Sequence, residues 1–104
     1  MTNPGKTIDA QGGPGGAAPA KIELQPERHR FAAVAEGGGG ELVYRLQGDV
    51  MTIVHTEVDK SLEGRGVAGQ LVQAALEHAR EKGLRVDPQC GYARAYMARH
   101  PPSP

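Results

Sequence analysis

The change of hydrophobic period between Val58 and Val67 limits the possible folds of this chain more than any other feature. Residues 50–58 (Val-Met-Thr-Ile-Val-His-Thr-Glu-Val) are rich in β-branched side chains and apolar on both faces, which predicts a central strand. From Val67 onward, apolar residues recur at the spacing of an amphipathic helix. They are Val67, Ala68, Leu71, Val72, Ala75, Leu76 and Ala79. The chain therefore contains a strand-to-helix junction, and both elements have to share one small core.

Shorter patterns on both sides of the junction complete the predicted order of elements. The expected elements are strands at 30–35, 41–47, 50–58 and 84–86, and helices at 64–82 and 89–99. The glycine run at 37–40 is expected to be a flexible connection, and Gly48-Asp49 a two-residue hairpin turn. Asp87 followed by Pro88 is typical of an N-cap and a first helical residue. The order β-β-β-α-β-α predicts an α/β or α+β fold with a mixed sheet.

Length and composition limit the organisation and the class of the protein. The first 20 of the 104 residues include five Gly and three Pro, so we expect a disordered tail at 1–20, one folded domain at 21–101 and a terminal tail at 102–104. The formal net charge is zero, which argues against nucleic-acid binding, and no apolar run is long enough to predict a membrane helix. Cys90 is the only cysteine, so an intrachain disulfide is excluded and a reduced, cytoplasmic setting is expected.

A glycine-rich segment at 63–69 (Glu-Gly-Arg-Gly-Val-Ala-Gly) begins the predicted helix. The first amides of a helix have no intrahelical partner, and together with the helix dipole they form an anion site. A diphosphate at this point would be bound by main-chain N–H groups, with Arg65 available for a further charge-assisted bond. The alternative is a helix start at which small residues are needed only for packing.

The same glycines also match the dinucleotide-binding fingerprint Gly-x-Gly-x-x-Gly, and Asp87 lies near the distance expected for the acid that binds the ribose. That fingerprint follows its strand directly, whereas residues 59–63 intervene here. The preceding strands form a predicted meander and leave no room for a doubly wound sheet. A dinucleotide-binding fold is therefore not expected.

The junction resembles the signature of the GNAT superfamily of acetyl-CoA-dependent acyltransferases, which is Arg/Gln-x-x-Gly-x-Gly/Ala between a strand and a helix. Gly66 and Ala68 match this signature, whereas Glu63 stands where the family usually has Arg or Gln. A longer set of matches resembles the branch of short, stand-alone members with a YjdJ-type N-acetyltransferase domain. Within residues 24–101 this set comprises His55-Thr56-Glu57-Val58, Leu62 to Ala68, Pro88-x-Cys90-x-Tyr92 and His100-Pro101.

This resemblance implies a GNAT-like fold with a mixed, mostly antiparallel sheet and two helices. It implies that acetyl-CoA is the co-substrate and that an unidentified amine accepts the acetyl group. It also implies that the strand ending near Val58 contacts the pantetheine arm and that Tyr92 belongs to the acetyl-CoA site. The amides expected to hold the diphosphate are those of Gly64, Arg65, Gly66, Val67 and Ala68. The open alternative is a module that binds CoA, acetyl-CoA or another protein without catalysing a reaction.

Three side chains are candidates for the chemical step. Cys90 is expected in the first turn of the second helix, where the helix N-terminus lowers the pKa of a thiol, and the resemblance implies that the matching cysteine lies in the active site. The alternative is a buried, inert small hydrophobe. His55 and Glu57 lie two apart on a strand and so project from one face, and either is suited to remove the ammonium proton of the acceptor. In the alternative, His55 bonds within the sheet and Glu57 pairs with an arginine.

Two further observations concern the remaining polar and aromatic residues. Tyr92 and Tyr96 are four apart and share one helix face, where they either line a pocket or pack the helix onto the sheet. No pair of histidines has the helical spacing of metal ligands, so no metal site is expected.

Overall fold

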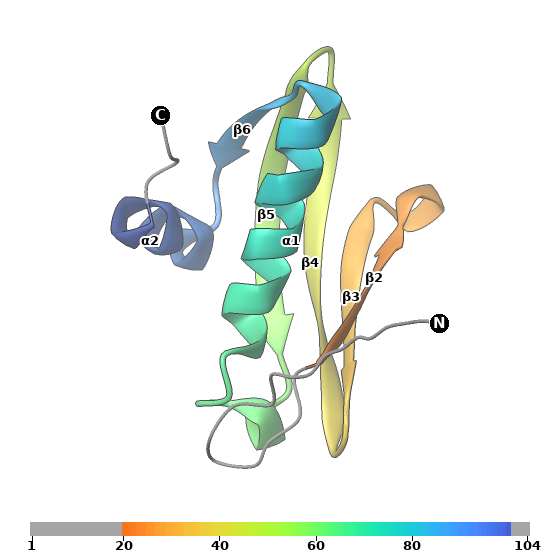
Figure 1. The fold of residues 1–104 in the computed structure, drawn as a ribbon, viewed down its shortest axis with the longest axis vertical. Helices are drawn as coiled ribbons and strands as arrows, with labels where there is room; N and C mark the ends of the chain where they lie inside the picture. Colours follow the sequence, from red (N-terminus) through yellow and green to blue (C-terminus); the bar gives the residue numbers. More distant parts are fainter. Residues whose placement is uncertain (1–19, 101–104) are drawn as a thin grey trace, which may run out of the picture.

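The computed structural model describes residues 20–100, in which five strands form one sheet in the order β2-β3-β4-β5-β6 (Figure 1). The elements are the strands β2 (Lys21–Gln25), β3 (Arg30–Ala35), β4 (Gly38–Gln47), β5 (Val50–Val58) and β6 (Arg85–Pro88), the helices α1 (Val67–Lys82) and α2 (Gly91–Arg99), and the 3-10 turns η1 (Pro26–Arg28) and η2 (Lys60–Leu62). Strands β2 to β5 pair antiparallel, and β6 pairs parallel with β5. The predicted mixed, mostly antiparallel sheet with two helices is confirmed.

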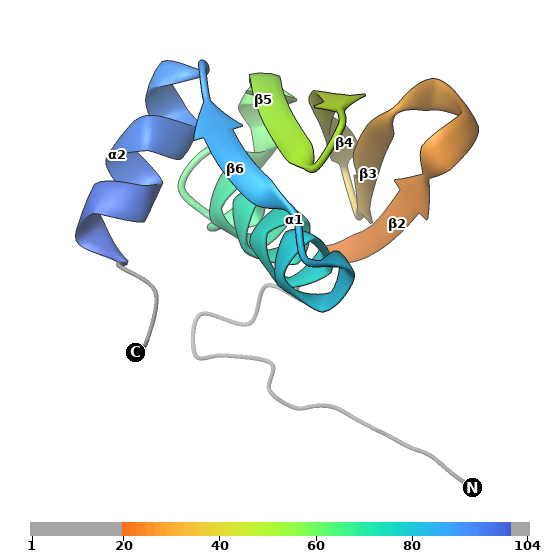
Figure 2. The same ribbon diagram turned by 90° about the horizontal axis from the view of Figure 1, so that it is seen from above.

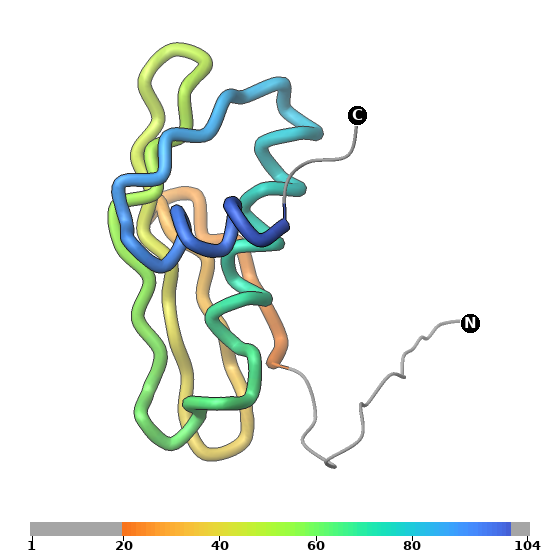
Figure 3. The backbone as a smooth tube through the Cα atoms, turned by 90° about the vertical axis from the view of Figure 1, so that its left-hand side faces the viewer, coloured from red at the N-terminus to blue at the C-terminus, as the bar shows by residue number. Residues whose placement is uncertain are grey.

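The two helices leave one face of the sheet uncovered. Helix α1 packs across the other face, and α2 lies beside the edge that β6 forms (Figure 2). Figure 3 shows α2 running from the β5 side of the sheet across towards α1. We call the uncovered face, which carries the register row Glu23, Ala32, Glu41 and Glu57, the open face. None of the helices in residues 20–100 has the length and apolar character needed to cross a membrane.

The apolar stripe of α1 forms the core with the inward face of the sheet. The largest fully buried side chains are Leu42, Met51, Ile53, Leu62, Leu71 and Val72. Burial of each such side chain stabilises the fold by roughly 1.5–3 kcal/mol. Leu71 and Val72 come from α1, and Ala75 and Ala79 continue the same stripe. This packing fixes the axis of α1 and so holds its N-terminus near the end of β5.

The predicted flexible connection at 37–40 is wrong, because most of this glycine run belongs to β4. Gly39 pairs with Val34, and Gly40 pairs with Ala33. A Cβ atom on Gly39 would lie 2.8 Å from the carbonyl oxygen of Ala33, and one on Gly40 would lie 2.9 Å from that of Glu57. Glycine is therefore required here by the close approach of neighbouring strands, while the turn itself contains Gly37.

The first strand, β2, has no counterpart in the predicted order of elements. Its residues are mostly exposed, as on an edge strand, and Ile22 alone packs partly buried against the core. The preceding residue, Ala20, is buried, and its N–H donates to Gln70 Oε1 at 3.2 Å. The remaining parts of the two predicted tails, at 1–19 and 102–104, lie outside the described residues.

Both helices begin later than predicted. Helix α1 starts at Val67 because Gly64 and Gly66 have φ of 85° and 78°, which right-handed helix geometry excludes. Helix α2 starts at Gly91 with Cys90 as its N-cap, so the predicted N-cap at Asp87 is wrong. Asp87 extends β6 instead, because the parallel pairing of β6 with β5 continues through it.

Candidate active site

Strands β5 and β6, at one edge of the sheet, separate halfway along β5. Strand β6 pairs only with the first half of β5, as far as Ile53 opposite Pro88. At that point the carbonyl of Ile53 accepts hydrogen bonds from the N–H groups of both Gln89 (3.0 Å) and Cys90 (3.1 Å). The chain then turns away into α2 (Figure 1). Among the described residues, positions 54–58 of β5 have no strand partner on that side, and such an edge can bind an extended ligand through main-chain hydrogen bonds.

A β-bulge in β5 decides which of its side chains face the helices. The register between β4 and β5 shifts after Val43, which leaves Val54 as an extra residue on β5. Strict alternation from the buried Ile53 would direct His55 towards the core. The bulge reverses the alternation, so His55 lies on the open face and Thr56 faces α1.

Cys90 lies at the point where β5 and β6 separate and α2 begins. Its thiol is half-buried and donates to Thr56 Oγ1 at 3.6 Å. Burial by itself raises the pKa of the Cys90 thiol, but the main-chain groups of Ala93 and Tyr92 and the hydroxyl of Thr56 stabilise the thiolate and bring that pKa below the ordinary value. The expected helix N-terminal environment of Cys90 is therefore present, with Cys90 as N-cap and not as third helical residue.

The N-terminus of α1 presents unpaired main-chain donors. In the described part of the chain, no main-chain carbonyl accepts from the N–H groups of Gly64, Gly66, Val67 or Ala68. The N–H of Arg65 differs, because it donates to the carbonyl of Leu62 at 3.2 Å. Four of the five predicted amides are therefore available to an anion, and the Arg65 amide is not.

The tyrosines of α2 close over the first turn of α1. A Cβ atom added to Gly69 would lie 3.4 Å from Tyr92 Oη and 3.4 Å from a ring carbon of Tyr96, so a side chain larger than alanine has no room there. The two rings lie on one helix face, as predicted, with centroids 6.3 Å apart. Tyr92 remains exposed, and its hydroxyl lies near Gly69 in the first turn of α1.

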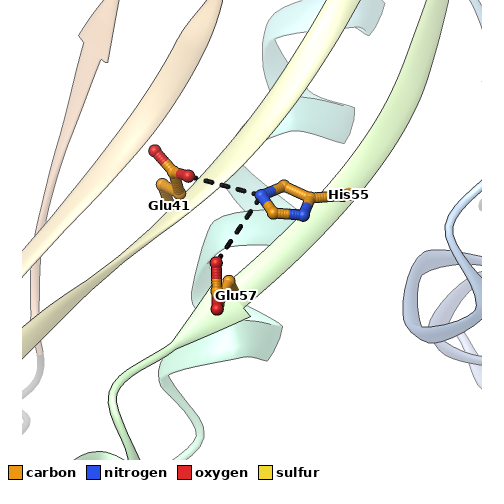
Figure 4. Close-up of side chains that lie close together, drawn as sticks. All are labelled: Glu41, His55 and Glu57. Carbon is orange, nitrogen blue, oxygen red and sulfur yellow. Dashed lines mark hydrogen bonds and ion pairs between the residues drawn. The ribbon is translucent and has the colours of Figure 1, made fainter.

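A polar cluster occupies the open face on the reverse side of β5. Glu41 Oε2 lies 3.3 Å from His55 Nε2, and Glu57 Oε1 lies 3.9 Å from the same nitrogen (Figure 4). Hydrogen bonds from His55 and then from Arg30 lower the pKa of the Glu41 carboxyl. The donor atoms of Glu41, His55 and Glu57 lie within 4.8 Å of one another, but the guanidinium of Arg30 already neutralises Glu41 at 2.8 Å. The ion pair with Arg30 and the contact with His55 hold the Glu41 carboxylate in place.

A separate groove of about 560 Å³ lies between α1, β6 and α2. Its walls are Gln73, Leu76, Glu77, Ala79, Arg80, Leu84, Val86, Tyr96, Met97 and His100. The helical residues among them lie beyond the first turns of α1 and α2, whereas Leu84 precedes β6 and Val86 belongs to it. Neither Cys90 nor the free amides of α1 line this groove.

The family model for GCN5-related N-acetyltransferases matches residues 30–103. The chain belongs to this family. Protein NATD1 of Bos taurus is 30% identical over 93 residues, and the match covers 86% of this chain and 82% of that protein. Protein NATD1 of Mus musculus is 31% identical over 86 residues, and the match covers 80% of this chain and 78% of that protein. The solution structure of a Staphylococcus aureus protein described as GCN5-like is 29% identical with a TM-score of 0.61, covering 76% of this chain and 78% of that one.

The residues expected to serve this acetyltransferase domain divide between the two sides of β5. On the helix side, Val58 ends the unpaired half of β5, and Cys90 and Tyr92 lie at the start of α2. The turn into α1 and its first residues hold Gly64, Gly66, Val67 and Ala68. His55 and Glu57 share one face, as predicted, but that face is the open one. Glu41 and the contact of Thr56 with Cys90 were not predicted, because both depend on strand register and tertiary packing.

The environment of Cys90 predicts a thiol that ionises at lower pH than an ordinary cysteine. The alkylation rate of Cys90 with iodoacetamide should therefore reach half its maximum at a lower pH than that of free cysteine under the same conditions. Replacing Thr56 by Val removes one stabilising partner of the thiolate and should raise this midpoint by a few tenths of a pH unit, since a net hydrogen bond contributes about 0.5–1 kcal/mol. Thr52→Val is the control, because Thr52 lies on the same strand opposite Asp87. An unchanged midpoint in Thr56→Val would contradict the assigned contact.

Proposed function

We propose that this chain binds acetyl-CoA between the N-terminus of α1 and the free edge of β5, and transfers the acetyl group to an amine. The observation that carries the proposal is the position of the Cys90 thiol, which stands beside Thr56 where β5 and β6 separate. Three kinds of group support the proposal: unpaired helix amides for an anion, an unpaired strand edge for an amide-containing arm, and a thiol with a lowered pKa for acyl chemistry.

The α1 end of the site is suited to the diphosphate of CoA. The amides of Gly64, Gly66, Val67 and Ala68 would donate to its oxygens, and the positive end of the helix dipole favours its charge. The guanidinium of Arg65 makes only a long, exposed bond to the Glu36 carbonyl (3.4 Å), so it is available to pair with a phosphate.

The chemical step would use Cys90 as the nucleophile. Its thiolate attacks the thioester carbonyl, the new carbon–sulfur bond forms, and the bond to the CoA sulfur breaks, so that CoA leaves and takes up a proton. The acceptor amine, after losing its ammonium proton to His55 or Glu57, attacks the acetyl-cysteine and restores the thiol. The lowered pKa of the Cys90 thiol supports this route, because it increases the share of thiolate available to attack the thioester.

Replacing Gly66 by Ala tests the diphosphate site. The new Cβ would project into the space in front of the α1 amides, so the Kd for CoA measured by calorimetry should rise about tenfold or more, ~1.4 kcal/mol. Gly83→Ala is the matched control, because Gly83 caps the other end of α1 with a similar φ of 70° and carries the same backbone strain. Equal loss of affinity in both variants, or no CoA binding by the native chain, would overturn the proposed site.

Mass spectrometry of the protein after incubation with acetyl-CoA tests the covalent route. We expect one added acetyl group on Cys90 of the native protein and no added acetyl group in Cys90→Ala. The rate of acetyl transfer to a model amine should fall in Cys90→Ala by about a hundredfold, ~2.7 kcal/mol. Cys90→Ser is the conservative control, because it retains a hydroxyl at the N-cap of α2. Transfer at the native rate by Cys90→Ala would exclude Cys90 as the nucleophile and leave the direct route.

A further inference from the structure

We propose that Glu41 is a positioning residue that holds the His55 ring with its proton on Nε2, so that Nδ1 is free to take the proton of the acceptor amine. This inference rests on the proposed function and takes His55, of the two candidates, as the base. It concerns the open face of the sheet, where Glu41 of β4 reaches His55 of β5 at 3.3 Å.

The orientation of the Glu41 carboxylate is fixed because each of its two oxygens has a partner. Its Oε1 accepts from Arg30 Nη1 at 2.8 Å, and its Oε2 lies at His55 Nε2. Arg30 is in turn held by Gln25, whose Oε1 accepts from Arg30 Nε at 2.7 Å. A chain of hydrogen bonds therefore crosses four strands, from β2 through β3 and β4 to β5, and it ends at the imidazole.

The charges around the imidazole determine which nitrogen carries the proton. Glu41 and Glu57 are direct pairing partners across β4 and β5, and two like charges in this position destabilise a sheet unless a donor lies between them. His55 Nε2 is that donor, because it faces both carboxylates, and carboxylates only accept hydrogen bonds. The hydrogen bonds that lower the pKa of the Glu41 carboxyl keep it ionised at neutral pH.

The second ring nitrogen is left with a free lone pair. In Figure 4 it points away from both carboxylates, and within residues 20–100 it has no hydrogen-bond partner. His55 immediately precedes Thr56 on β5, and Thr56 contacts Cys90 on the other face of the strand. The base thus belongs to the unpaired edge, and the nucleophile contacts the next residue of that edge. The amine would reach the acetyl group across this edge from the open face.

Nitrogen NMR of histidine-labelled protein tests the tautomer without requiring turnover. We expect the native protein to show His55 as a single tautomer protonated on Nε2, and Glu41→Gln to show a mixture of both tautomers. Glu23→Gln is the matched control, since Glu23 lies in the same register row of the open face but on the distant strand β2. A native His55 protonated on Nδ1, or a spectrum unchanged in Glu41→Gln, would overturn the proposal.

A double-mutant cycle tests whether Glu41 acts through His55. Glu41→Gln should lower kcat about tenfold while leaving the KM for acetyl-CoA unchanged. Glu41→Asp, which keeps the carboxylate, should recover part of the rate. In the His55→Asn background, Glu41→Gln should have no further effect on kcat. A loss in that background as large as in the native protein would overturn the positioning role, whereas a native protein without any transfer activity would count against the proposed function itself.

Discussion

The carbonyl of Ile53 is the point on which the rest of the site depends. It accepts the N–H groups of both Gln89 and Cys90, so it ends the pairing of β5 with β6 and starts α2 at the same place. Because the parallel pairing stops there, the second half of β5 keeps a free edge, and Cys90 becomes the N-cap of a helix that faces this edge. The end of the β5–β6 pairing, the position of the Cys90 thiol and the start of α2 thus all follow from the two hydrogen bonds that the Ile53 carbonyl accepts.

Two local irregularities give the two sides of β5 different chemistry. The bulge at Val54 directs Thr56 towards Cys90 and places His55 on the open face, where it contacts Glu41, the ion-pair partner of Arg30. The left-handed conformation of Gly66 lets the chain enter α1 without a side-chain cap, which leaves its first amides unpaired. In the proposed reaction, the acyl donor approaches from the α1 side and the amine from the open face, and they meet at the unpaired edge of β5.

The sequence predicted what depends on local pattern and missed what depends on pairing. The change of period at the junction predicted β5 and α1, and the glycines of 64–69 predicted an exposed helix start. The glycines of β4 have the pattern of a loop, because their role is to admit the backbone of β3 and β5, and a single sequence does not show that close approach. The pair of Glu41 with His55 was missed for a similar reason, since only the register of β4 and β5 brings residues 14 apart together.

Amide chemical shifts recorded during a titration with CoA test the central claim most directly, because they report where the ligand lies. Binding across the gap between β5 and β6 predicts the largest changes at the amides of Gly66, Val67 and Ala68, with further changes at residues 54–58 and around Cys90. The signals of the groove between the later turns of α1 and α2, such as Glu77 and Met97, should change little. Changes confined to that groove, with the α1 N-terminus unaffected, would contradict the assigned site.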